Sequence, residues 1–238
     1  MKNSNKVLLT IIICFLLCTV IVAVIVRGNL IFSNVVSGEI VSSEKGENIT
    51  KIFNVGDFSE LDMSGFGHVL VKAGEQSNIS ISTDEGYFSN ITVGLTGNKL
   101  GINTEHGIKL GHDRKVDIVI VTKQPLKKII INGASHLDYA DINSNNLILE
   151  ANGASHCDLS GKINSLQIET NGASDVNAKN LIANDVNLET SGAANIKVYA
   201  QNSLEIHAAG VASIDYYGNP KKVVKDAAGM VSINRVYR

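Results

Sequence analysis

A glycine returns every 18 to 20 residues through the second half of the chain, each time inside a short unit such as Asn-Gly-Ala-Ser. These glycines are Gly133, Gly153, Gly172, Gly192, Gly210 and Gly229. A repeat at such a short period indicates units that cannot bury an apolar face alone and therefore stack on their neighbours. The repeat constrains the fold more than any other feature of the sequence.

Each unit contains two short stretches in which apolar and polar residues alternate. Before one glycine the apolar residues are Leu147, Leu149 and Ala151. Four residues after successive glycines lie Leu137, Cys157, Val176 and Ile196. A period of two is typical of strands with one buried face. The sequence therefore predicts an all-β fold, a parallel β-helix (a solenoid with coils of about 18–20 residues) in which equivalent residues stack about 4.8 Å apart.

Other repeat architectures fit less well. Amphipathic helices need a period of 3.6 residues over some ten residues, and these runs are shorter and rich in β-branched residues. Leucine-rich repeats need a Leu-x-x-Leu-x-Leu frame, which is missing. A series of β-hairpins with Asn-Gly turns stays an alternative, although antiparallel hairpins do not require the same residue at every nineteenth position.

The repeat also assigns places to other residues. Glycine suits a tight corner between strands, and the asparagine before it is expected to form a ladder of side-chain hydrogen bonds. In the last unit Lys225 takes the place of Leu149, and Arg235 takes the place of Leu159. Charges at inward places predict a coil that closes the stack.

The segment before the regular repeats has a weaker pattern. Leu61 precedes Gly67 by six residues, as Leu147 precedes Gly153. We therefore expect one β-helix domain over 49–238, with irregular opening coils in 49–124, including some antiparallel pairing, and regular repeats in 125–238.

An uncharged run of twenty residues, 7–26, lies near the start of the chain. As a helix it is long enough to span a bilayer, and Lys2 and Lys6 before it place the N-terminus in the cytoplasm. We predict a cytoplasmic stub and transmembrane signal-anchor in 1–27, a linker in 28–48, and an extracytoplasmic C-terminal domain on a single-pass protein of the cell membrane. Cleavage as a signal peptide and lipidation at Cys18 are alternatives, but Val24 to Arg27 form a poor cleavage site and Leu17 is large for a lipoprotein signal.

Charge and cysteine content exclude several classes of protein. The net charge is −2, from 21 basic and 23 acidic residues, so nucleic acid is not expected as a partner. Cys157 is the single cysteine after the apolar run, which excludes an internal disulfide in the predicted domain. Its column neighbours are apolar, and we expect a buried, unreactive thiol.

Several of these motifs occur together in one known family. The Asn/Ser-Gly-Ala-Ser units, the run 116–121 followed by Leu-Lys-Lys-Ile at 126–129, and the closing Ile-Asp-Tyr-Tyr-Gly-Asn-Pro at 214–220 resemble the "putative auto-transporter adhesin, head GIN domain" family over residues 52–238. The resemblance implies a right-handed parallel β-helix outside the cytoplasmic membrane, often behind a signal or anchor. It carries over no catalytic residue and implies no cofactor.

Two columns of polar residues are candidate binding sites. Three residues after their glycines lie His136, His156 and Asp175, which stacking would bring together as ligands for a transition metal. Three residues before the glycines lie Glu150, Glu169 and Glu189, a column suited to a hard cation such as Ca²⁺ or to a basic partner. Asp138 and Asp158 form a shorter acidic pair. For all of them, a solvated face without a ligand is the alternative.

The sequence contains no motif of a known catalytic centre. We therefore expect a non-enzymatic surface or envelope module, adhesin-like or structural, that binds an unknown surface glycan or protein ligand and contacts the lipid bilayer through 7–26. A sensory or regulatory membrane protein that reports an envelope signal through a membrane partner is an alternative. A carbohydrate-active β-helix enzyme is a second one, but coils this short leave little room for the loops of a cleft.

Overall fold

The computed structural model describes residues 36–42, 49–104 and 115–237. The chain divides into two compact units, Met1–Phe32 and Ser33–Arg238, and all described residues belong to the second. The expected membrane helix of 7–26 lies outside the described residues. In the part that is described, no helix is long and apolar enough to cross a membrane.

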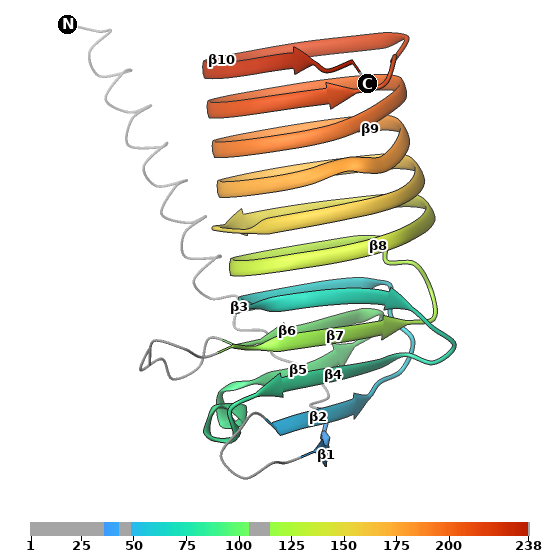
Figure 1. Ribbon diagram of the computed structural model, residues 1–238, viewed down its shortest axis with the longest axis vertical. Coiled ribbons are helices and arrows are strands. Elements are labelled where there is room, and N and C mark those ends of the chain that lie inside the picture. Colours follow the sequence, from blue (N-terminus) through green and yellow to red (C-terminus); the bar gives the residue numbers. More distant parts are fainter. Residues whose placement is uncertain (1–35, 43–48, 105–114, 238) are drawn as a thin grey trace, which may run out of the picture. The chain divides into compact units, whose positions relative to one another are not determined.

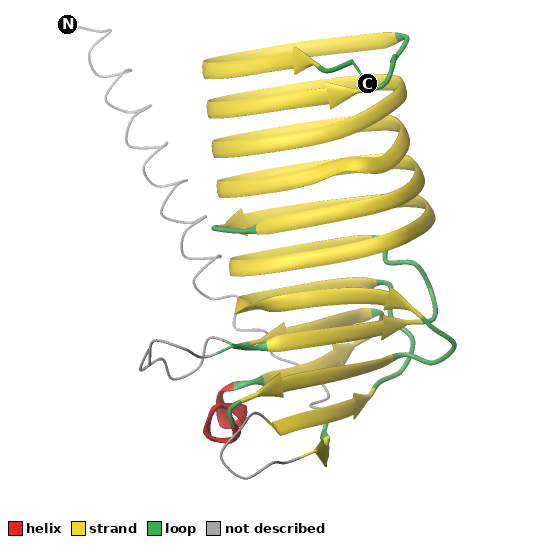
Figure 2. Ribbon diagram, in the orientation of Figure 1, coloured by secondary structure: helices red, strands yellow, loops and turns green. Residues whose placement is uncertain are grey.

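The described residues of the second unit are all-β and form a mixed sheet of ten strands with one short 3₁₀ helix (Figure 2). Its elements are β1 (Glu39–Ser42), β2 (Ile49–Asn54), β3 (Glu60–Ala73), β4 (Asn78–Thr83), η1 (Glu85–Asn90), β5 (Thr92–Thr96), β6 (Lys99–Asn103), β7 (Asp117–Thr122), β8 (Lys128–Gly153), β9 (His156–Tyr217) and β10 (Lys222–Arg235). Strand β1 lies within the segment expected to be a linker, where it pairs with β2.

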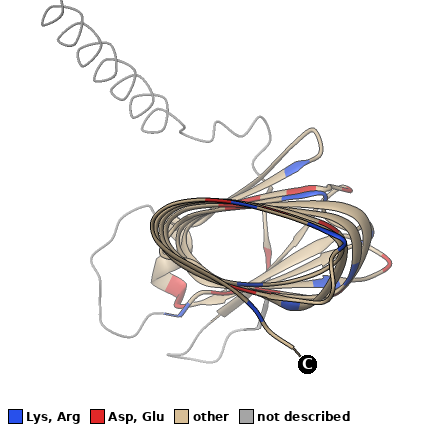
Figure 3. Cartoon of the chain, turned by 90° about the horizontal axis from the view of Figure 1, so that it is seen from above, with Lys and Arg blue, Asp and Glu red and all other residues tan. Residues whose placement is uncertain are grey.

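Parallel pairing links the long strands β3, β8, β9 and β10. Glycine faces glycine in each pair, as Gly65 with Gly133, Gly153 with Gly172 and Gly210 with Gly229. Figure 1 shows the resulting passes of chain stacked one above another, and Figure 3 shows them superposed when viewed from above. The register predicted from the repeat is confirmed, since Leu137 pairs with Cys157 and Leu147 with Leu166.

Antiparallel pairing dominates the opening part. Strands β1, β2, β4 and β7 pair antiparallel in that order, and β5 pairs antiparallel with β6. Both β6 and β7 pair in parallel with β3, which joins this part to the first regular pass. The aromatic residues Phe58, Tyr87 and Phe88 are buried here and fill the core at this end.

Inward-facing side chains of the parallel passes form one apolar core. Leu137, Cys157, Val176 and Ile196 are all 0% exposed, as the alternating pattern predicts. Most other polar residues of the strands face outward, so the exterior carries columns of equivalent polar side chains, while a few small hydroxyl residues such as Thr170 and Thr190 are buried. Two of these columns are asparagine ladders, in which each amide donates to the amide oxygen of the residue one pass earlier. The donor–acceptor pairs are Asn152 to Asn132, Asn171 to Asn152, Asn164 to Asn145 and Asn184 to Asn164.

The last pass differs from those before it. Lys225 pairs with Ile206 and Arg235 with Tyr216, so both charges occupy register positions that are apolar in earlier passes. The Lys225 ammonium lies 4.9 Å from the centre of the Tyr216 ring, and the Arg235 guanidinium donates to the Gly218 carbonyl oxygen. The last pass itself stays largely exposed, with Val223 39% and Met230 75% exposed, and these two charged side chains pack against the preceding pass.

One alignment made from the sequence is wrong. The six-residue offset from Leu61 placed Gly67 at the corner, but the register pairs Gly65 with Gly133 and Leu61 with Ile129. The two glycines of β3 lie two residues apart, and the sequence offset does not distinguish them. The corrected register moves His68 to the third position after its corner glycine.

A histidine–aspartate column on the outer face

Three histidines occupy the third position after the corner glycine in successive passes. His68 of β3 pairs with His136 of β8, which pairs with His156 of β9. The ring centres lie 4.9 Å apart between His68 and His136, and 4.6 Å apart between His136 and His156. The parallel register therefore brings together three imidazoles from residues far apart in the sequence.

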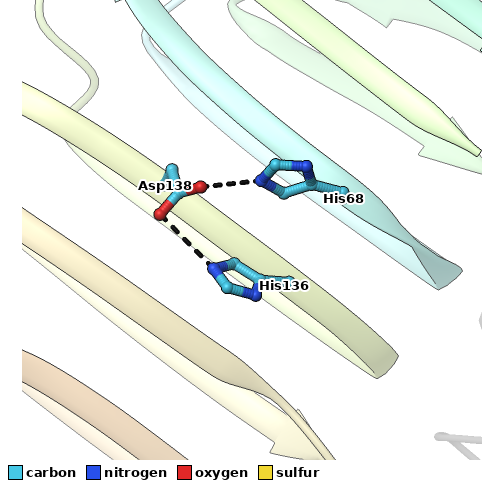
Figure 4. Close-up of side chains that lie close together, drawn as sticks. All are labelled: His68, His136 and Asp138. Atoms are coloured by element: carbon cyan, nitrogen blue, oxygen red, sulfur yellow. Dashed lines mark hydrogen bonds and ion pairs between the residues drawn. The ribbon is translucent and has the colours of Figure 1, made fainter.

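Aspartates two residues further along the strands face these rings. The Oδ2 atom of Asp138 lies 2.7 Å from Nε2 of His68, and its Oδ1 atom lies 3.3 Å from Nε2 of His136 (Figure 4). One pass further on, Oδ2 of Asp158 lies 2.8 Å from Nε2 of His156 and 3.7 Å from Nε2 of His136. Each aspartate thus lies near the Nε2 atoms of two histidines.

The other ring nitrogen of the two outer histidines also faces a carboxylate. Nδ1 of His156 lies 3.1 Å from Oδ2 of Asp175, and Nδ1 of His68 lies 3.7 Å from Oδ1 of Asp117. The predicted neighbours His136, His156 and Asp175 are therefore close together. Asp175, however, faces the side of His156 away from Asp158. We call His68, His136 and His156 with Asp117, Asp138, Asp158 and Asp175 the histidine–aspartate column.

The histidines stabilise the ionised form of the central carboxylate. Partial burial raises the pKa of Asp138, but hydrogen bonds and the charge of His68 and His136 outweigh this effect and hold the pKa below its ordinary value. Asp138 is therefore an anion at neutral pH and an acceptor for both neighbouring rings.

Sequence reasoning missed His68 and Asp117 as members of this column. His68 stands 68 residues before its register partner His136, outside the regular repeat, and the glycine alignment placed it one residue after Gly67. An alignment on Gly65 would have found it, because both histidines lie three residues after their glycine. Asp117 comes from β7, which pairs with β3 outside the repeat, so no repeat alignment could reveal it.

Beside the column runs a groove of about 880 Å³. Its floor consists largely of small residues, Ala134, Ala154, Ala173 and Ala193, and the three histidines line it. The second position after Gly133, Gly153 and Gly172 carries Ser135, Ser155 and Ser174, which are buried and hydrogen-bonded within the stack. The side chains at the corner are therefore small, and the larger histidines stand above them.

The glutamate column is arranged differently. Glu150 pairs in register with Glu169, but the Glu150 carboxylate lies 2.7 Å from the Lys128 ammonium and Glu169 accepts from Gln167. Glu169 and Glu189 line a separate pocket of about 350 Å³. Among the described residues, just two groups of three ligand atoms lie within 4.8 Å of one another, and no glutamate belongs to either. Cation binding by Glu150, Glu169 and Glu189 stays a prediction.

Cys157 has the surroundings expected of an inert thiol. Burial, with smaller contributions from the negative charges of Asp158 and Asp175, raises its pKa to about 12. Because the thiolate is the reactive form, the neutral buried thiol packs as a small apolar side chain.

The family model described as "Putative auto-transporter adhesin, head GIN domain" matches residues 57–220. The chain belongs to this family. The resemblance drawn from the repeat and its closing motif is thus confirmed for GIN-domain membership, with a match narrower than 52–238. No curated protein sequence matches the chain.

Solved structures share the fold of this GIN-domain chain. A "putative adhesin" from Bacteroides fragilis aligns with a TM-score of 0.67 and 20% identity, over 81% of this chain and 98% of that one. A "putative adhesin" from Parabacteroides distasonis aligns with a TM-score of 0.59 and 17% identity, over 81% of this chain and 94% of that one. At such identities the likeness extends to the fold alone.

Proposed function

We propose that this protein is a non-enzymatic, adhesin-like module of the cell envelope that binds a surface glycan. In the proposal, residues 7–26 anchor it as a single-pass protein of the cell membrane, and the parallel passes form a right-handed β-helix on the extracytoplasmic side. Family membership supports an adhesin-like role, and the twenty-residue apolar run supports the anchor. The register of the long parallel strands supports the β-helix.

One observation carries the choice of a glycan. The ladder of Asn145, Asn164 and Asn184 lines a polar groove of about 510 Å³ together with Lys162 and Gln201. An amide side chain both donates and accepts hydrogen bonds, as sugar hydroxyls do. A column of equivalent amides repeats this chemistry from pass to pass, which suits a polymer of repeating sugar units.

The test is binding of the full chain, held in lipid nanodiscs, to arrays of glycans and cell-wall polymers. We expect retention on a polysaccharide without any change in its chain length, and at least tenfold weaker retention for Asn164→Ala, whose amide is the middle of the ladder. Asn171→Ala is the matched control, because it removes an exposed ladder asparagine from a different face. Equal loss in both variants, cleavage of the polymer, or retention on protein ligands alone would reject the glycan proposal.

The anchor has a separate test. The full chain should stay with the membrane pellet after an alkaline wash, whereas a chain starting at residue 28 should be released. Release of the full chain would refute the proposed anchor and leave the glycan proposal standing.

A further inference from the structure

We propose that the histidine–aspartate column binds one divalent transition-metal ion such as Zn²⁺. Its ligands are the Nε2 atoms of His68 and His136 and a carboxylate oxygen of Asp138, and His136, His156 and Asp158 form a second, overlapping seat. This inference is independent of glycan binding, since the column lies on a different set of register positions from the asparagine ladder of Asn145, Asn164 and Asn184.

The ligand set matches transition-metal chemistry. Imidazole nitrogen combined with carboxylate oxygen is a common donor set for Zn²⁺, whereas Ca²⁺ and Mg²⁺ prefer oxygen alone. Three protein ligands leave the fourth tetrahedral position to water or to a partner. The side chains of His68, His136 and Asp138 are 46%, 45% and 35% exposed, so an ion can reach them from solvent.

The proposed ligand atoms lie near enough to one another to coordinate an ion after small side-chain movements. At metal–ligand distances of about 2.1 Å, two ligand atoms of a tetrahedral site lie about 3.4 Å apart. The Nε2 atom of His136 is already 3.3 Å from Oδ1 of Asp138, and Nε2 of His68 is 2.7 Å from Oδ2. The three ligand atoms of each seat lie within 4.8 Å of one another. Half-exposed side chains adjust over such distances by rotation alone.

Carboxylates behind the outer rings favour the ligating orientation. Asp175 lies within hydrogen-bond distance of Nδ1 of His156, at 3.1 Å, whereas Asp117 lies 3.7 Å from Nδ1 of His68, a longer, electrostatic contact; in both rings Nε2 points toward the column. A histidine that ligates a metal commonly donates its other N–H to a carboxylate, which fixes the tautomer and strengthens the ligand. What distinguishes the column is that two such imidazoles converge on one carboxylate, because His207 also lies between two carboxylates but belongs to neither group of three ligand atoms.

Electrostatics favours the same occupant. Four carboxylates, those of Asp117, Asp138, Asp158 and Asp175, surround three imidazoles along the column. A divalent cation at either seat offsets the repulsion between them.

Both seats share His136, and this predicts the stoichiometry. A single Nε2 lone pair binds one ion at a time, so the column holds one ion per chain. Loss of His136 removes both seats. Loss of His68 leaves the seat of His136, His156 and Asp158, and loss of His156 leaves the seat of His68, His136 and Asp138.

The test is calorimetric titration of the full chain, free of any histidine tag, with ZnCl₂, supported by the visible absorption of Co²⁺ in the same site. We expect one ion per chain, no measurable site in His136→Ala, and affinity about tenfold weaker in His68→Ala. The double variant His68→Ala/His156→Ala should lose the site. Asp138→Asn/Asp158→Asn, which keeps side-chain size, should also lose it. Added Zn²⁺ should raise the Tm of the wild type but not that of His136→Ala.

The matched control is His207→Ala. His207 also lies between two carboxylates, those of Glu205 and Asp226, but belongs to neither group of three ligand atoms. This variant should bind Zn²⁺ like the wild type. Absence of both calorimetric heat and cobalt absorption, undiminished binding by His136→Ala, or equal loss in His207→Ala would overturn the proposal.

Discussion

The corner glycines determine how closely successive passes approach. Gly172 has φ of +122°, and a Cβ atom built on it would lie 2.7 Å from the carbonyl oxygen of Gly153. Both the backbone conformation and the contact exclude a side chain, and the contact partner is backbone that cannot rotate away.

We therefore predict that Gly172→Ala lowers the free energy of unfolding by roughly 3 kcal/mol, from backbone strain together with the clash. Urea denaturation followed by circular dichroism measures it. Gly56→Ala is the control, because Gly56 is exposed, has an ordinary φ, and an added Cβ meets only Leu95 at 3.4 Å. A loss in Gly172→Ala no larger than in the control would show that the corner tolerates a side chain.

The burial of some single residues could be predicted from the sequence, whereas the register and contacts of others could not. Cys157 was predicted to be buried because its column neighbours are apolar, and it is fully buried. His68 could not be placed with the same rule, because two glycines of β3, Gly65 and Gly67, compete for the corner. The contact between His136 and Asp138, two residues apart on one strand, depends on the rotamers of both side chains. A repeat alignment carries no information about rotamers.

At the scale of elements, hydrogen-bonded ladders tie neighbouring passes together. Asn152 donates to Asn132 and accepts from Asn171, with both amide contacts at 3.1 Å. It is half-buried, so its partners would not be fully resatisfied by water after its removal.

Asn152→Ala should lower the free energy of unfolding by about 2 kcal/mol, since it breaks two ladder hydrogen bonds, and Asn171→Ala should cost about half as much. Thermal or urea unfolding of the two variants measures the difference. Indistinguishable stabilities would mean that the ladder is replaced by water at no cost.

The parallel elements were predictable and the antiparallel ones were not. The repeat contains its own register, because residues with the same place in each unit must face one another. Phe53 of β2 pairs with Ile79 of β4, but neither strand belongs to a repeat. Their sequences do not indicate which strand each one pairs with. The aromatic core of the opening part, with Tyr87 of η1, likewise follows from contacts between unlike segments.

For the molecule as a whole, the stack should tolerate a change in the number of passes. Deleting residues 153–171 joins Asn152 to Gly172, which preserves the Asn-Gly-Ala-Ser unit and the register. We expect a folded protein with cooperative unfolding and a smaller free energy of unfolding, because stability in such arrays is a sum over neighbouring units.

Circular dichroism and urea denaturation measure this outcome, and deletion of the half-unit 157–166 is the control. The half-unit deletion places apolar positions opposite polar ones and should prevent folding. Equal damage by both deletions would show that the passes are not equivalent units. The whole-unit deletion keeps His68, His136 and Asp138, so it should retain Zn²⁺ binding.

The pairing of β10 with β9 has a mechanical consequence. Hydrogen bonds between passes run along the direction of stacking, so tension applied at the C-terminus loads them a few at a time rather than all at once. Such tension would peel off β10 first and then each earlier pass, releasing about 65 Å of extended chain for every unit of 19 residues. Under a constant force, the protein would lengthen in steps of equal size, and each step would absorb mechanical work.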